Sequence, residues 1–277
     1  MTINRACLDK SYGPIAIRVD ASSIEAYADA TLDPLAIYRS DEPVAPPVFG
    51  IVPIWPAVQA ALADEELGID VGRVVHGEQR MTFHRLIRAG DDLRSAGWIA
   101  SISEKGPNEV FVLSFETHDA GGSLVTSQDV VCVSRGTARG DGSSRSVMKK
   151  RGSSQQESPA PLAVRAVSLP DDITFRYAKA SGDDNRIHID EDFARQMGLP
   201  GIIVQGMSLF AIAVQAVVEG PCHEDPSRLK SASVRFVRPI RPGRAFEVAV
   251  LELAEQVGFE GRGPTSEIVL RGRAQTR

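Results

Sequence analysis

The stretch "YADATLD", residues 27–33, returns later in the chain as "YAKASGD", residues 177–183. A second stretch, "FHRLIRAG" at residues 83–90, likewise returns as "FVRPIRPG" at residues 236–243, and both contain F-x-R-x-I-R-x-G. The two matches come in the same order and at nearly the same spacing. Self-similarity at one spacing is typical of repeated structural units, so the chain is predicted to contain two copies of one fold.

Each copy begins with a helical pattern and continues with β-rich segments. Asp20 can cap a helix over residues 21–31, and Ser168 can do the same in the second copy, with Pro170 near its first turn. A second apolar helix is predicted in each copy, over residues 50–63 and 206–219. Alternating segments broken by glycine and proline turns then predict antiparallel strands. This order indicates an α+β fold in which one sheet wraps around one helix.

The boundary between the copies is marked by composition. Residues 136–160 are rich in glycine, serine and charge and poor in apolar residues, which is typical of a linker. We therefore place the first copy at residues 1–138, a flexible linker at 139–163 and the second copy at 164–277.

The whole-chain composition excludes several classes of protein. The 277 residues are 43% apolar and 24% charged, as in ordinary globular proteins. A net charge of -5 argues against a nucleic-acid partner. The chain has neither an apolar run of about 18 residues, which a membrane span needs, nor the apolar core of a secretory signal. The three cysteines are scattered. We expect a cytoplasmic protein that contacts no membrane.

A polar loop follows the second copy of the first repeat. Its sequence, "SGDDNRIHID" at residues 181–190, contains Asp183, Asn185 and His188. At the matching positions the first copy keeps the aspartate, as Asp33, but has leucine and tyrosine in place of the amide and the imidazole. A site that is needed once per chain would explain this divergence, whereas a purely structural loop would not.

This loop could be a metal site, a structural turn or an acid–base site. A calcium loop would need glycine where His188 stands, and zinc would need a second histidine or cysteine nearby, so no metal is expected. A structural interpretation accounts for Asp190, which can cap a short helix that ends at Gly198. An acid–base site accounts for Asp183 and His188 together, because a carboxylate and an imidazole can take a proton from water as it attacks an alkene.

The loop and its flanks carry a family resemblance. "YAKASGDDNRIHIDEDFA", residues 177–194, resembles the signature of the MaoC-like R-specific enoyl-CoA hydratases, S-G-D-x-N-P, an apolar residue and H. "GLPGIIVQGM", "VRFVRPIRPG" and "VVHGEQRMTFHRLIRAGDDL" are similar to other parts of the double-hotdog members. Two residues depart from the pattern. Arg186 replaces the usual proline, so that the loop is less rigid or the arginine meets a phosphate or another acidic group. Gln205 replaces a histidine.

This resemblance implies two fused hotdog folds that form a pseudo-dimer with one continuous sheet, the first copy being non-catalytic. It implies reversible addition of water to trans-2-enoyl thioesters, the reaction of an R-specific 2-enoyl-CoA hydratase or (3R)-hydroxyacyl-thioester dehydratase. Asp183 and His188 would activate water or remove the α-proton, and Asn185 would orient the site. The backbone N–H of Gly206, where the second helix should begin, would polarise the thioester carbonyl.

The resemblance also indicates what the site would bind. No metal or redox cofactor is implied, because coenzyme A or the arm of an acyl carrier protein comes with the substrate. Gln205 and Met207 are expected to contact the substrate. Phe49 and Trp55 of the first copy are expected to line a tunnel for the acyl chain, which Pro47, Pro53 and Pro56 could open by giving their helix an irregular start. A homodimer is expected.

Two other functions remain open. A non-catalytic subunit that binds acyl thioesters is one, although such a protein would tolerate decay of the polar loop. A hotdog acyl-CoA thioesterase is the other. Those enzymes usually place their carboxylate on the long helix, and residues 206–219 contain no acid before Glu219.

Overall fold

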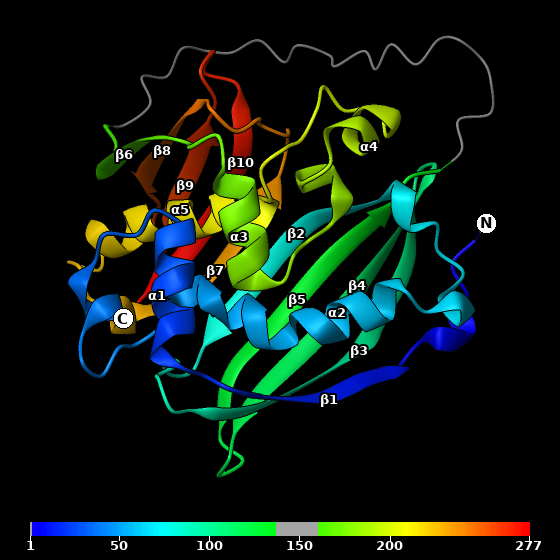
Figure 1. Ribbon diagram of the computed structural model, residues 1–277, viewed down its shortest axis with the longest axis horizontal. Helices are drawn as coiled ribbons and strands as arrows, with labels where there is room; N and C mark the ends of the chain where they lie inside the picture. The colour runs from blue at the N-terminus through cyan, green and yellow to red at the C-terminus, as the bar shows by residue number, and fades with distance from the viewer. Residues whose placement is uncertain (1, 137–159) are drawn as a thin grey trace.

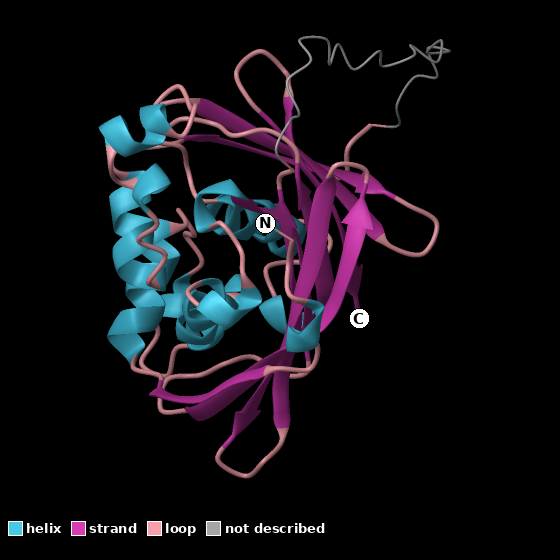
Figure 2. Cartoon of the chain, turned by 90° about the vertical axis from the view of Figure 1, so that its right-hand side faces the viewer, coloured by secondary structure: helices cyan, strands magenta, loops and turns pink. Residues whose placement is uncertain are grey.

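The computed structural model describes residues 2–136 and 160–277. Their strands form one ten-stranded sheet in the order β1-β3-β4-β5-β2-β7-β10-β9-β8-β6. The helices lie against one face of this sheet (Figures 1 and 2). Residues 139–159 of the predicted linker lie outside the described residues, and residue 163 already belongs to a strand.

Each copy contributes five strands, and the order within the two halves is the same. The first half contains β1 (Ser11–Arg18), β2 (Val74–Phe83), β3 (Asp92–Lys105), β4 (Asn108–Asp119) and β5 (Leu124–Ser134). The second contains β6 (Ala163–Ser168), β7 (Leu229–Phe236), β8 (Ala245–Glu252), β9 (Val257–Arg262) and β10 (Ile268–Thr276). The halves join where β2 pairs antiparallel with β7, with Gln79 opposite Val234. The predicted α+β fold of two fused hotdogs, with one continuous sheet, is confirmed.

The α-helices are α1 (Ala21–Ala30), α2 (Trp55–Leu62), α3 (Ile173–Ser181), α4 (Glu191–Gln196) and α5 (Gly206–Glu219). Asp20 caps α1 as predicted, because its side chain accepts a hydrogen bond from the Ser23 N–H. The predicted cap at Ser168 is wrong. Ser168 ends strand β6, opposite Ala245, so α3 begins only at Ile173. Among the described helices, none is long and apolar enough to cross a membrane.

The second apolar helix differs between the copies. In the second copy it is the single helix α5. In the first copy a 3-10 segment, Pro47–Ile54, precedes α2. Pro53 lies inside this segment and has no N–H to donate, which disfavours a regular α-helix there. The irregular start that the prolines predicted is therefore confirmed.

Matched residues of the two copies meet where α1 packs against α3. The rings of Tyr27 and Tyr177 are 5.7 Å apart, and both side chains are fully buried. Their hydroxyl oxygens lie 3.5 Å apart. Because these tyrosines occupy the same position in the repeat, the copies are related by an approximate two-fold axis that passes between the two helices.

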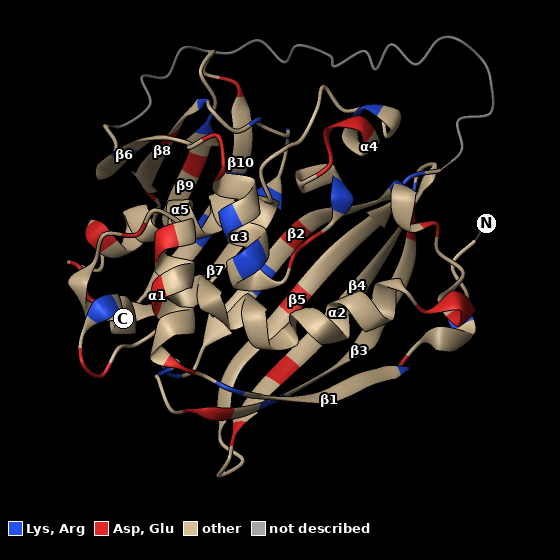
Figure 3. Cartoon of the chain, viewed as in Figure 1, with Lys and Arg blue, Asp and Glu red and all other residues tan. Residues whose placement is uncertain are grey.

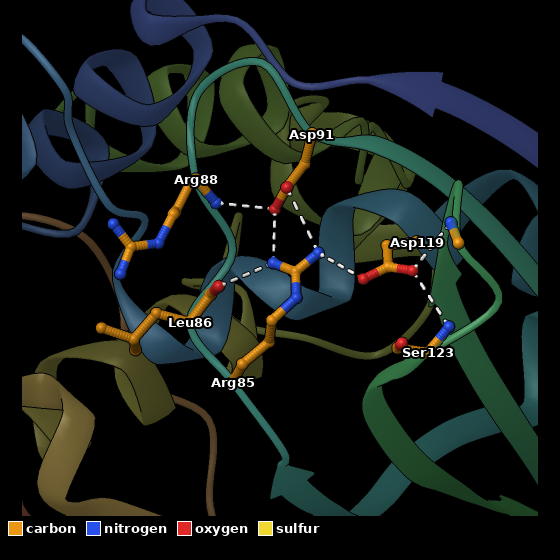
Figure 4. A network of polar contacts seen from close by, with 7 residues as sticks. Arg85, Leu86, Arg88, Asp91, Asp119 and Ser123 are labelled. Atoms are coloured by element: carbon orange, nitrogen blue, oxygen red, sulfur yellow. Dashed lines mark hydrogen bonds and ion pairs between the residues drawn. The ribbon is translucent and has the colours of Figure 1, made fainter.

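A polar network holds the connection from β2 to β3 (Figure 4). The guanidinium of Arg85 donates to both carboxylate oxygens of Asp91, at 2.7 and 3.2 Å, and to Asp119 at 3.2 Å. Asp119 also accepts from the Ser123 N–H in the β4–β5 turn. Arg85 is the first of the two arginines in the repeated F-x-R-x-I-R-x-G stretch. The repeat therefore includes a residue that ties two loops of the first copy together.

Candidate active site

The polar loop begins where α3 ends. Gly182 adopts a left-handed conformation, with φ of 82°, and so turns the chain out of the helix. A short 3-10 helix, Arg186–His188, follows, and the Asn185 side chain accepts a hydrogen bond from the Ile187 N–H at 3.3 Å. This geometry buries Asp183 and His188 together, at 8% and 7% exposure, although both are polar.

The ring of His188 is fixed by one hydrogen bond. Its Nδ1 lies 2.7 Å from the carbonyl oxygen of Ile203. A carbonyl oxygen can only accept, so Nδ1 carries the hydrogen. In the neutral ring, Nε2 therefore keeps its lone pair and can take a proton from a substrate or a water molecule.

Burial raises the pKa of the Asp183 carboxyl above its ordinary value. His188 and the backbone N–H of Asn185 act in the opposite direction and lower this pKa, and the effect of His188 means that the two side chains lie within electrostatic range. Asp183 can therefore hold a proton at a higher pH than an exposed aspartate, which suits a group that must both accept and return one.

Helix α5 begins beside this pair. Its first residue is Gly206, as predicted, and the first N–H groups of a helix have no partner within the helix. A Cβ atom on Gly206 would lie 3.0 Å from the ring of Phe236, so the glycine lets the ring pack closely. The preceding residue, Gln205, is fully buried and donates from Nε2 to the carbonyl oxygens of Thr174 at 2.9 Å and Asp183 at 3.3 Å.

The first copy also contributes to this region. The Cδ1 atom of Trp55 lies 3.2 Å from the place where a Cβ on Gly182 would be, so its indole borders the loop. One turn further along α2, Gln59 donates to the Gly182 carbonyl at 3.4 Å and to Asp184 at 3.3 Å. Gln59 was not among the site residues predicted from the sequence. The repeated sequence "AVQA", at residues 57–60 and 213–216, was the signal that could have revealed it.

Two other residues that were expected at the substrate lie in the core. Phe49 packs edge-on against Tyr27, with ring centres 5.3 Å apart, and is 1% exposed. Met207 is also buried, within the first turn of α5. Neither side chain reaches solvent in this conformation.

Arg186 contacts an acidic group, one of the two kinds of partner considered for it. Its Nη2 donates to Asp190 at 2.6 Å, and its guanidinium stacks on the ring of Phe193, 4.2 Å from the ring centre. Asp190 also caps α4 as predicted, by accepting from the Phe193 N–H. Basic residues lie on the exposed side of the neighbouring helix α3, at Arg176 and Lys179 (Figure 3).

The corresponding place in the first copy is filled differently. Asp33 is buried and accepts from the Leu35 N–H at 3.2 Å and from Gln215 at 3.0 Å. Burial raises its pKa to about 7. Beside it, Arg165 donates to Glu219 at 2.8 Å, so an ion pair lies next to the remaining aspartate.

The second copy thus combines an acid–base pair with the N-terminus of a helix. Asp183 and His188 can exchange protons, and the N–H groups at the start of α5 can stabilise negative charge on an oxygen atom. In the described part of the chain, no three His, Cys, Asp or Glu side chains are placed to bind a metal ion together.

Comparisons with known proteins agree with the division of the chain into two copies. The second half matches the MaoC like domain over residues 151–270, and the first half matches the FAS1-like dehydratase domain region over residues 9–128. A UPF0336 protein of Parafrankia sp. (strain EAN1pec) is 36% identical over 148 residues, which are 50% of this chain and 98% of that protein.

Two longer relatives are named as enzymes. The peroxisomal multifunctional enzyme type 2 of Mus musculus is 26% identical over 230 residues. The match covers 81% of this chain but only 30% of the mouse protein. A probable enoyl-CoA hydratase 2 of Dictyostelium discoideum is 25% identical over 216 residues, with 77% and 73% of the two chains covered.

Solved structures share the fold. A MaoC-like dehydratase from Phytophthora capsici superposes with a TM-score of 0.83 at 19% identity and covers 100% of this chain and 98% of its own. The peroxisomal multifunctional enzyme type 2 of Drosophila melanogaster gives a TM-score of 0.78 at 20% identity, with 96% of this chain and 48% of that chain covered.

The molecule is a double-hotdog protein. This class follows from the order of the strands in the sheet, from the repeat in the sequence and from the superpositions on solved structures. The domain matches specify it further: the second half of the chain is a MaoC-like domain, and the first half is a FAS1-like dehydratase domain region.

Proposed function

We propose that this protein is an R-specific 2-enoyl-thioester hydratase, which also catalyses the reverse dehydration of (3R)-hydroxyacyl thioesters. The observation that carries the proposal is the buried pair formed by Asp183 and His188, with Nε2 of His188 free to act as a base. The name of one relative, a probable enoyl-CoA hydratase 2, supports the same reaction class.

In hydration, the oxygen of a water molecule forms a bond to the β-carbon of the enoyl group. Asp183 and His188 take one proton from that water as the bond forms. The electron pair of the double bond moves through the α-carbon toward the thioester oxygen, where the N–H of Gly206 stabilises the developing negative charge. The pair then returns a proton to the α-carbon. Dehydration follows the same steps in reverse.

The substrate class follows from this chemistry. An enolate can form only if a carbonyl is conjugated with the double bond, and a thioester provides that carbonyl. We propose that coenzyme A or an acyl carrier protein supplies the thioester, so that its arm enters as part of the substrate. The reaction adds water across the double bond with proton transfers and with no net oxidation or reduction, so its steps call on no redox or metal cofactor.

The deciding assay uses trans-2-enoyl-CoA with the purified full chain. We expect the conjugated enoyl absorbance to fall without release of free thiol, and chiral analysis to give the (3R)-hydroxyacyl product. Thiol release would identify a thioesterase instead. Saturable binding of the substrate with no turnover would identify a non-catalytic acyl-thioester-binding subunit.

A further inference from the structure

We propose that Gln205 is a positioning residue. It fixes the position of the acid–base pair relative to the N-terminus of α5, which faces the thioester oxygen. This inference rests on the proposed function. It assigns to Gln205 a role through the backbone of Asp183 instead of the direct contact with substrate that the sequence suggested.

The side-chain amide of Gln205 joins three segments of the second copy. It is fully buried. Its Nε2 donates to Thr174 O in α3 and to Asp183 O in the polar loop, while Gln205 itself immediately precedes α5. One side chain therefore links the helix that leads into the loop, the loop that carries Asp183, and the helix whose first N–H belongs to Gly206.

The backbone of Asp183 depends on this contact. Its N–H donates to the Ser181 hydroxyl at 3.1 Å, and that hydroxyl donates to Tyr177 O at 2.7 Å, so the N–H side is held by α3. Within residues 2–136 and 160–277, Gln205 is the single hydrogen-bond donor to the Asp183 carbonyl. Without it, the carbonyl side of Asp183 would be buried with no hydrogen bond.

Packing alone does not favour glutamine at this position. The other end of the amide, Oε1, is buried and has no hydrogen-bond partner among the described residues. A buried polar atom without a partner destabilises a fold. Methionine fills a similar volume and buries no such oxygen. What the amide adds is the N–H donor that reaches the loop.

The position of Gln205 gives this donor a catalytic consequence. Gly206 is its neighbour in the chain, so the side chain and the backbone of two successive residues fix the spacing between Asp183 and the N-terminus of α5. A displacement of about 1 Å in a catalytic geometry can lower the rate by about 100-fold.

The test compares Gln205→Met with a matched control, Gln215→Met. Gln215 is a buried glutamine of α5, and its Oε1 also has no partner among the described residues. Its amide, however, donates to Asp33 of the non-catalytic copy. With trans-2-enoyl-CoA, and after correction for the folded fraction, we expect Gln205→Met to lower kcat by about 10- to 100-fold. KM should change by less than about three-fold, because Gln205 does not touch the substrate, and Gln215→Met should keep the parent kcat.

A conservative variant separates positioning from packing. The ring N–H of Gln205→His can donate to a nearby carbonyl, so this variant should recover part of the kcat that Gln205→Met loses. A Gln205→Met enzyme with kcat within about three-fold of Gln215→Met would overturn the proposal. So would equal losses in Gln205→Met and Gln205→His.

A second measurement does not depend on turnover. If the parent hydrated no enoyl-CoA, the proposed function would fail, and positioning would be judged from the NMR signals of the His188 ring, assigned with His188→Gln. Signals that move in Gln205→Met and stay in place in Gln215→Met would support positioning of Asp183 beside His188. Signals that are unchanged in both variants would overturn it.

Discussion

The side-chain nitrogen of Gln215 lies 3.0 Å from the Oδ1 atom of Asp33, so helix α5 of the second copy holds the aspartate of the first. The reciprocal contact also exists, because Gln59 of the first copy donates to Asp184 and to the Gly182 carbonyl. Each loop is thus held by an amide from the other copy. The chemistry differs, since Tyr38 stands in the first copy where the second has His188.

The first prediction concerns the pH dependence of stability. Burial raises the pKa of Asp33 to about 7, whereas an aspartate in an unfolded chain titrates near 3.9. Between about pH 4 and pH 7 the folded state therefore binds the extra proton, and the free energy of unfolding falls as the pH rises. At about 1.4 kcal/mol per pKa unit the loss amounts to a few kcal/mol above pH 7.

The substitution Asp33→Asn should remove most of this dependence. Denaturant unfolding from pH 5 to pH 8 should show that the free energy of unfolding of the parent falls relative to that of the variant as the pH rises. Asp41→Asn, at an exposed position, is the control and should follow the parent. Turnover of Asp33→Asn should stay close to that of the parent. A loss as large as for Asp183→Asn would mean that the active site lies in the first copy and not in the second.

The second prediction tests the catalytic pair. Asp183→Asn and His188→Gln each remove an acid–base group with little change of shape, so each should lower kcat by about 100-fold or more. Circular dichroism should show that both variants keep the parent fold. Activity within a few-fold of the parent in either folded variant would contradict the proposed mechanism.

The third prediction concerns Trp55, whose indole borders Gly182. Trp55→Ala should shift the preference among enoyl-CoA chain lengths more than it changes the best rate, because one methylene in an apolar pocket is worth about 1–3 kcal/mol of discrimination. The measurement is kcat/KM for a series of chain lengths. Profiles that overlay after correction for folded protein would show that Trp55 serves only in packing.

The fourth prediction concerns the ion pair of Arg165 and Glu219, whose side chains are 16% and 29% exposed. Arg165→Leu leaves Glu219 without this partner and removes the donor to the Leu32 carbonyl, so it should destabilise the fold by about 2 kcal/mol. Arg176→Leu breaks a surface pair with Asp172 and should change stability by about 0.5 kcal/mol or less. Equal midpoints of urea unfolding for the two variants would contradict the structural role of Arg165.

The sequence predicted the parts of the molecule that local patterns specify. Asp183 and His188 are five residues apart, and the turn after α3 needs only Gly182 and a short 3-10 helix to bring them together. The start of α5 at Gly206 was predicted from the apolar helical segment "GMSLFAIAVQAVVE", residues 206–219. The two-copy architecture followed from the repeats, since residues that match in sequence occupy matching places in the fold.

Features that depend on distant partners were missed. Strand β6 is six residues long and pairs with β8, far along the chain, so its sequence alone does not distinguish it from a loop or a helix start. The burial of Gln205 follows from carbonyl groups that α3 and the polar loop bring to it. The contact of Gln59 with the loop of the other copy arises only when the two copies assemble.

The contact between Tyr27 and Tyr177 has a genetic consequence. In a dimer of identical chains, one mutation at this position would alter both sides of the contact at once. Here the two tyrosines belong to one chain at separate codons, so each copy can acquire substitutions that its counterpart does not share. Trp55 of the first copy and Ala211 of the second occupy matching positions, because each lies four residues before the glutamine of the repeated AVQA sequence. The two copies therefore carry different residues at this position. In a tandem chain, one copy can therefore carry the catalytic residues while the other copy changes independently and influences which substrates bind.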